Sequence, residues 1–134
     1  MYKKIIVIFL FSFLFSESGE WGVVPMFSAT WDNNLGFNYG VGMSIGKWGE
    51  GIFTGVYSSY AFSKKGNNFS FGSYSGLGIA TFRFGVNRLK LKGEGTAYWG
   101  IETSSSMIIG HARFGIAKKH DIYKLCYAVG LGIF

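Results

Sequence analysis

The last thirteen residues, 122–134, alternate strictly, and this alternation constrains the fold more than any other feature of the chain. Every second position holds a large, mainly apolar residue: Tyr123, Leu125, Tyr127, Val129, Leu131 and Ile133. The positions between them are small or polar: Lys124, Cys126, Ala128, Gly130 and Gly132. Successive side chains of a β-strand point to opposite faces. The segment therefore predicts a strand with one large apolar face and one small face.

Similar alternation recurs along the chain and predicts eight antiparallel strands. Their expected ranges are 23–31, 35–45, 51–62, 69–79, 82–89, 96–103, 106–117 and 122–134. The composition suits repeated hairpins, because 21 glycines and 19% aromatic residues accompany a single proline. At 134 residues the chain is long enough for one domain.

Polar or charged clusters and short breaks in the alternation predict the turns, at 32–34, 47–50, 64–68, 80–81, 90–95, 104–105 and 118–121. These turns bring apolar residues of neighbouring strands onto one face, as cross-strand pairing requires. The expected pairs are Ile79 with Phe82, Leu77 with Phe84, Ile101 with Ile108, Trp99 with Gly110, Ile116 with Tyr123, and Phe114 with Leu125.

Residues 1–18 have the pattern of a cleavable signal peptide. Lys3 and Lys4 precede an apolar stretch at 5–15, and Ser16 and Ser18 are small residues suited to a cut after Ser18. The apolar stretch is about half the ~20 residues that a membrane-spanning helix needs. We expect export and removal of residues 1–18, which takes two of 13 basic and one of 7 acidic residues and leaves a domain of 19–134 with net charge +5.

Several classes of function find no support in the composition. A lone Cys126 cannot form an internal disulfide, and no metal-binding spacing of Cys and His surrounds it, so no cofactor is expected. The glycines form no phosphate-binding loop between a strand and a helix. Export argues against nucleic acid as a partner despite the basic charge, and the irregular turn spacing argues against an amyloid-like stack.

Three observations favour a barrel that turns its large apolar face outward into a membrane. The opposite face is rich in glycine, which suits a narrow lumen better than a solvated surface. Nearly all charged residues lie in turns. The strand lengths bracket the ~9–11 residues of a tilted membrane strand. Aromatic residues near strand ends would then form girdles at the membrane interfaces: Trp21, Trp31, Trp48, Phe62, Phe69 and Tyr123.

A few polar residues fall on the small face and are expected inside the barrel: Arg83, Tyr98, Glu102, His111 and Arg113. Buried charges need partners, so these groups would form interior ion pairs. Two alternatives stay open. A positively charged lumen would make a narrow pore for small solutes or anions, unless aromatic side chains fill the bore. An exported soluble barrel would instead turn its large face inward around an apolar ligand.

At the level of pattern, most of the chain after residue 18 resembles the small outer-membrane barrels of Gram-negative bacteria, the OmpA/OmpX-like class. The resemblance implies an eight-stranded, antiparallel, up-and-down transmembrane barrel located in the outer membrane. It also implies that the barrel-assembly machinery reads the C-terminal strand, although Phe134 falls on the parity of Gly132 and not on the apolar face. A monomer surrounded by outer-membrane lipids is expected.

In such a barrel both termini lie on the periplasmic side, so the first, third, fifth and seventh turns face outward. These turns hold six lysines: Lys64, Lys65, Lys90, Lys92, Lys118 and Lys119. The turns at the other end hold Lys47 and Glu50 as their charged residues. A net basic outer rim predicts contact with lipopolysaccharide phosphates, unless the lysines serve only to keep the loops solvated.

Catalysis is not expected from this pattern. In the predicted register His111 lies opposite Tyr98, and Glu102 lies opposite Met107, too far from His111 for a simple dyad. In lipid A deacylases of this architecture, the nucleophilic serine would stand two residues after the histidine, where this chain has Arg113. The sequence thus predicts a structural or binding role in the cell envelope without identifying a specific activity.

Overall fold

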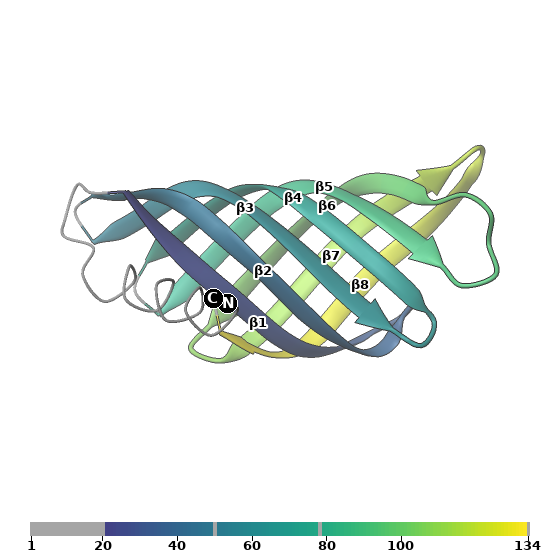
Figure 1. Ribbon diagram of the computed structural model, residues 1–134, viewed down its shortest axis with the longest axis horizontal. Helices are drawn as coiled ribbons and strands as arrows, with labels where there is room; N and C mark the ends of the chain where they lie inside the picture. The colour runs from purple at the N-terminus through teal and green to yellow at the C-terminus, as the bar shows by residue number, and fades with distance from the viewer. Residues whose placement is uncertain (1–20, 50, 78, 134) are drawn as a thin grey trace, which may run out of the picture.

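The computed structural model describes residues 21–49, 51–77 and 79–133, which form a closed barrel of eight antiparallel strands (Figure 1). The strands are β1 (Trp21–Asp32), β2 (Gly36–Gly49), β3 (Ile52–Ser63), β4 (Gly66–Leu77), β5 (Ala80–Leu91), β6 (Tyr98–Met107), β7 (Gly110–Lys119) and β8 (Ile122–Ile133). Each strand pairs with the next along the chain, and β8 pairs with β1 to close the barrel. The all-β class, the strand number and the up-and-down order are confirmed. The expected signal peptide, Glu50 and Phe134 lie outside the described residues.

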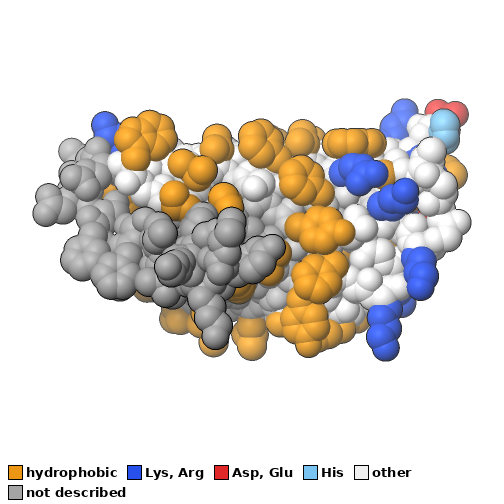
Figure 2. Space-filling view, viewed as in Figure 1, with side chains coloured by type: hydrophobic (Ala, Val, Ile, Leu, Met, Phe, Trp, Pro, Cys, Tyr) orange, Lys and Arg blue, Asp and Glu red, His pale blue; other side chains and the backbone are white. Residues whose placement is uncertain are grey.

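The large apolar side chains point outward. Among them Phe84 and Trp99 are 58% and 59% exposed, whereas Asn38 and Arg83 inside the barrel are 1% and 6% exposed. Figure 2 shows hydrophobic side chains distributed over the barrel wall, with Lys and Arg gathered mainly at one end. The alternative that placed the large apolar face inside the barrel is therefore wrong.

Five strands, β1, β2, β4, β5 and β6, are longer than the sequence suggested, and several turns are shorter. β2 continues to Gly49, so Lys47 and Trp48 belong to the strand, and β4 begins at Gly66, so Asn67 and Asn68 do too. Leu35, expected as the first outward residue of a strand, lies in the first turn and is buried inside the barrel. Asn68, which resembled a turn former, thus lengthens β4, because its polar side chain fits in the barrel interior.

The predicted register is wrong in three hairpins, although the assignment of residues to faces survives. Leu77 pairs with Ala80 instead of Phe84, and Ile116 pairs with Leu125 instead of Tyr123. The β6–β7 turn is formed by Ile108 and Ile109, so Ile101 pairs with Ile116.

The error in the β6–β7 register arises because the expected turn segment is a strand and the observed turn consists of apolar residues. Ser104 and Ser106 are buried lumen residues of β6 and form no turn. Ile108 makes the turn with a φ of 57°, a conformation that β-branched residues rarely adopt. Sequence preferences therefore favoured Ser104–Ser105 over the turn that forms.

Glycine on the inward face lets neighbouring strands bend closely together. Gly72 of β4 and Gly85 of β5 face each other, and a Cβ on either residue would collide with the backbone of the opposite strand. Glycine within a strand often marks such a bend of a narrow barrel. At Gly49, by contrast, an added Cβ meets no atom within 4 Å.

Replacing Gly85 with alanine should destabilise the folded barrel by about 1–3 kcal/mol, because the strand backbones must separate to admit the methyl group. The matched control, Gly49→Ala, should leave stability nearly unchanged. Urea titration of the folded form, followed by gel mobility without boiling, measures both variants. Equal stability of the two variants would contradict the proposed close approach.

Candidate functional site

The interior has a polar middle between two apolar clusters. One cluster joins Val24, Met26, Phe53, Tyr57 and Tyr74, with Trp48 packed against it. The other joins Leu35, Leu89, Tyr98, Ala117 and Cys126, with Leu91 packed against it. The second cluster lies toward the end that carries the turns 33–35, 64–65, 92–97 and 120–121, called the loop end below. Side chains thus occupy the barrel interior toward both ends.

An ion network crosses the polar middle. The Arg113 guanidinium donates to the Asp32 carboxylate, and Arg113 Nε lies 3.9 Å from Glu102 Oε2. The same Asp32 carboxylate accepts the backbone N–H groups of Asn34 at 2.7 Å and Leu35 at 2.8 Å. Asp32 therefore both closes the first turn and binds the guanidinium of Arg113, which projects from β7 into the lumen.

Amide side chains extend this network to the opposite wall. Asn68 Nδ2 donates to Glu102 Oε2 at 3.2 Å, and Asn87 Nδ2 donates to Asn68 Oδ1 at 3.2 Å. Thr30 and Asn38 are joined by a side-chain hydrogen bond of 3.1 Å. Buried polar groups need such partners, because an unpaired one costs about 1–3 kcal/mol. The polar middle consequently ties β1, β2, β4, β5, β6 and β7 together.

His111 lies opposite Ser106 and not opposite Tyr98. Ser106 Oγ and His111 Nδ1 are 3.0 Å apart, and the Arg83 guanidinium lies 3.4 Å from the ring nitrogens. Arg83 also lies 3.6 Å from the Met26 sulfur and 5.2 Å from the Tyr57 ring centroid. The imidazole of His111 is thus held between the Ser106 hydroxyl and the Arg83 guanidinium.

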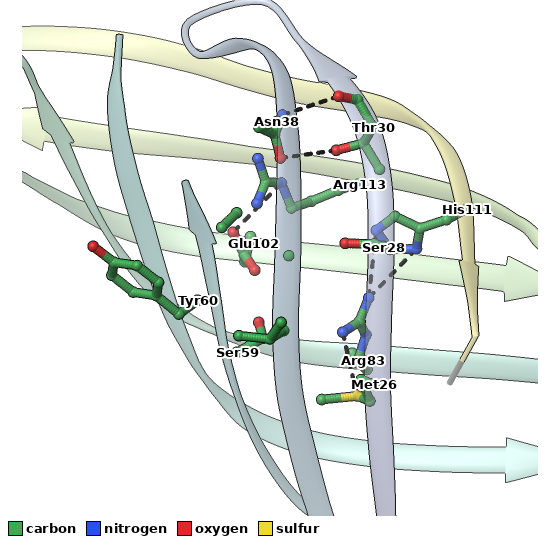
Figure 3. Close-up of a pocket in the computed structure, with 13 residues that line it drawn as sticks. Met26, Ser28, Thr30, Asn38, Ser59, Tyr60, Arg83, Glu102, His111 and Arg113 are labelled. Atoms are coloured by element: carbon green, nitrogen blue, oxygen red, sulfur yellow. Dashed lines mark hydrogen bonds and ion pairs between the residues drawn. The ribbon is translucent and has the colours of Figure 1, made fainter. Parts of the chain in front are cut away.

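A small cavity occupies the polar middle (Figure 3). Its volume is about 30 Å³, and Ser28, Asn38, Arg83, Glu102 and Arg113 are among its lining residues. Drug-sized ligands need sites of ~300–1,000 Å³. The cavity accommodates groups of the size of water and nothing as large as a sugar or a lipid headgroup.

The six candidate lysines lie together at the loop end. Lys64 and Lys65 form the β3–β4 turn, Lys90 lies near the end of β5, Lys92 lies in the β5–β6 loop, and Lys118 and Lys119 end β7. Figure 2 shows blue Lys and Arg side chains gathered at this end. At the other end the described residues include Lys47 as a charged side chain.

Two of these lysines are engaged by the protein itself. Lys119 forms an ion pair with Glu94 and lies 4.5 Å from the Tyr98 ring centroid. The hydrogen bond from Lys119 holds the pKa of the Glu94 carboxyl below its ordinary value. Lys118 Nζ lies 5.0 Å from the ring centroid of Tyr123.

Sequence reasoning placed Arg83, Tyr98, Glu102, His111 and Arg113 inside the barrel, and the structure has all five facing the lumen. It missed the residues that join them: Asp32, Asn68, Asn87 and Ser106. Asp32 and Asn68 resembled turn residues, and Ser106 was expected to begin a strand just after a turn. The positions of Ser106 and Asn87 on the inward parity were the available signals.

Comparisons of the chain with protein-family models, curated protein sequences and solved structures gave no significant match. Within residues 21–49, 51–77 and 79–133, no helix is long and apolar enough to cross a bilayer. The same residues contain no group of three or more His, Cys, Asp or Glu side chains arranged to hold a metal ion.

Replacing Arg113 with methionine should destabilise the barrel by about 3–5 kcal/mol, because Asp32 and Glu102 lose their buried cation. Asp32→Asn in the same chain should recover part of the loss, since the amide oxygen can still accept at the turn. Arg88→Met, which removes a cation 5.9 Å from the Trp99 ring, serves as the control. Urea unfolding compares the variants, and an equal loss in Arg113→Met and Arg88→Met would refute the network.

The Glu94–Lys119 pair should weaken in acid. A carboxyl with a lowered pKa stabilises the fold above its unfolded pKa, and this contribution disappears as the pH falls through the folded pKa. The carboxyl carbon of Glu94 in NMR should titrate with a midpoint below 4.5, the ordinary value. Lys119→Gln should move the midpoint up toward the ordinary value, because Lys119 is the largest cause of the lowered pKa. An unchanged midpoint would show that the pair is not the cause.

Proposed function

We propose that this chain is a small integral outer-membrane β-barrel protein of the OmpA/OmpX-like class, with a structural or binding role in the cell envelope. One observation carries the proposal. Every strand of the closed barrel exposes large apolar residues on the outer wall, while buried polar residues such as Asn38, Arg83 and Glu102 lie inside. Water would solvate such a wall poorly, because monomeric soluble proteins rarely expose apolar patches beyond a few hundred Å². A lipid environment removes that cost.

The dimensions of the wall support the same proposal. The strands have 10 to 14 residues, enough for the ~9–11 of a tilted membrane strand. Trp31, Phe62, Trp99 and Tyr123 are exposed near the loop end, where an aromatic girdle would meet the lipid headgroups. Trp48 departs from this pattern, because it is half-buried against the interior cluster.

The filled interior favours a structural or binding role over conduction. Apolar clusters lie toward both ends of the polar middle, and the cavity between them is about 30 Å³. A non-enzymatic role also fits the pairing of His111 with a cation. The surface that remains for a partner is the basic loop end, and lipopolysaccharide phosphates would complement its charge.

Membrane fractionation with gel mobility tests the proposal. A folded barrel has no free strand edges and should resist dodecyl sulfate until it is heated. We expect the protein in the outer-membrane fraction, with a band that moves on boiling. Recovery in the soluble fraction, without a heat-dependent shift, would refute the membrane assignment.

Replacing the six loop-end lysines with glutamine should weaken retention in lipopolysaccharide-containing membranes and leave retention in phospholipid membranes unchanged. The reason is the loss of charge pairing with phosphate. Flotation of both kinds of vesicle measures retention. The same retention of wild type and variant in lipopolysaccharide membranes would remove this part of the proposal.

A further inference from the structure

A groove of about 510 Å³ opens at the loop end between the β3–β4 turn and the β5–β6 loop. We call it the rim groove. Its lining includes two aromatic residues of β3, three lysines and one carboxylate: Tyr60, Phe62, Lys64, Lys90, Lys92 and Glu94. This volume is about the size of a small-molecule site and far larger than the interior cavity.

Within the part of the chain that the structure describes, the carboxylate of the rim groove forms an ion pair, whereas its lysines do not. Lys64, Lys90 and Lys92 line it, and no ion pair involving any of them occurs among the described residues. Glu94 also lines the groove, but its carboxylate pairs with Lys119. The groove therefore keeps the positive charge of three lysines while its one carboxylate is compensated.

The remaining lysines of the loop end do not line the groove. The Lys65 side chain extends toward Gly36 of β2, and Lys118 lies over Tyr123. Lys124 lies 5.4 Å from the Tyr98 ring centroid, at the interior cluster. Of the six lysines that looked equivalent in the sequence, Lys64, Lys90 and Lys92 line the groove, and Lys65, Lys118 and Lys119 do not.

Backbone contacts hold the two walls of the groove together. Lys92 N–H donates to the Lys65 carbonyl at 2.8 Å, and Gly66 pairs with Leu91. Glu94 N–H donates to the Leu91 carbonyl at 3.2 Å. Because these bonds already fix the turn and the loop, a ligand would spend little of its binding energy on ordering them.

The aromatic wall of the groove indicates what kind of anion fits. Tyr60 and Phe62 are exposed on the outer wall of β3, with stacked rings whose centroids are 6.1 Å apart. The groove thus joins the charged rim to the apolar wall. A free anion would use only the lysines, whereas an amphiphile would place its anionic head on the lysines and its chains beside the rings.

We propose that the rim groove is a binding site for the phosphomonoester headgroup of a membrane lipid, with Lys64, Lys90 and Lys92 contacting the phosphate. This inference rests on the proposed membrane location and names the part of the loop end that recognises the lipid. Clustered lysines suit a phosphomonoester, because its charge approaches −2 at neutral pH while a phosphodiester carries −1.

The test compares two triple variants of equal charge change in phosphatidylcholine nanodiscs. Lys64, Lys90 and Lys92 become glutamine in the groove variant, and Lys65, Lys118 and Lys124 become glutamine in the control. Native mass spectrometry titrates diphosphorylated lipid A, its dephosphorylated form and inorganic pyrophosphate. The groove variant should bind diphosphorylated lipid A on the order of tenfold more weakly than wild type, as expected for three exposed charge pairs. The control should match wild type, and the dephosphorylated lipid should bind all three proteins equally weakly.

Equal weakening in both triple variants would overturn the site, because general charge and not the groove would then explain binding. Pyrophosphate binding as tight as that of lipid A would overturn the assignment to a lipid. Each variant is first checked for the heat-dependent gel shift. A wild type that inserts and shifts but binds no lipid A refutes the rim groove alone, whereas a wild type that fails to insert refutes the proposed function.

Discussion

Closure of eight strands into one narrow barrel is the constraint on which the rest of the structure depends. Closure pairs every strand on both edges, so no edge remains to be covered. It also leaves so little room inside that glycine, serine and alanine must occupy much of the inward face. Large apolar side chains are then forced outward, and the few that point inward gather toward the two ends. The outward apolar wall and the filled interior are two results of the same geometric limit.

The polar middle shows how charged side chains are accommodated in the narrow interior of the barrel. Asp32, Glu102 and Arg113 lie inside the barrel, where Arg113 is the partner of both carboxylates. Asp32 has a second task, because its carboxylate also accepts two N–H groups of the first turn. Asp32 therefore joins the first turn of the loop end to the charged groups of the lumen. The Arg83–His111 pair, which lies deeper, is held by cation–ring and hydrogen-bond contacts.

Much of the fold was predictable from alternation, and the errors of register share one cause. Alternation assigns Phe84, Ile101 and Leu125 to the outer face, but sliding a strand by two residues leaves every side chain on the same face. Register was therefore left to turn preferences, which favoured Ser104–Ser105 over Ile108–Ile109. The contact of Ser106 with His111 was missed for that reason. The rim groove was out of reach as well, because it depends on the direction of side chains such as Lys65, which periodicity does not encode.

The apolar turn at Ile108–Ile109 also affects how the barrel would sit in a lipid layer. On the side of β4 to β7, apolar exposure continues past the strand ends through Ile79, Met107, Ile108 and Ile109. On the side of β1 and β2, the same end carries the exposed Lys47 paired with the exposed Trp21. A hydrophobic surface that is taller on one side is accommodated by tilting, at a modest cost per ångström of mismatch. The barrel axis would therefore lean from the membrane normal, with the β4–β7 side sunk deeper into the leaflet opposite the loop end.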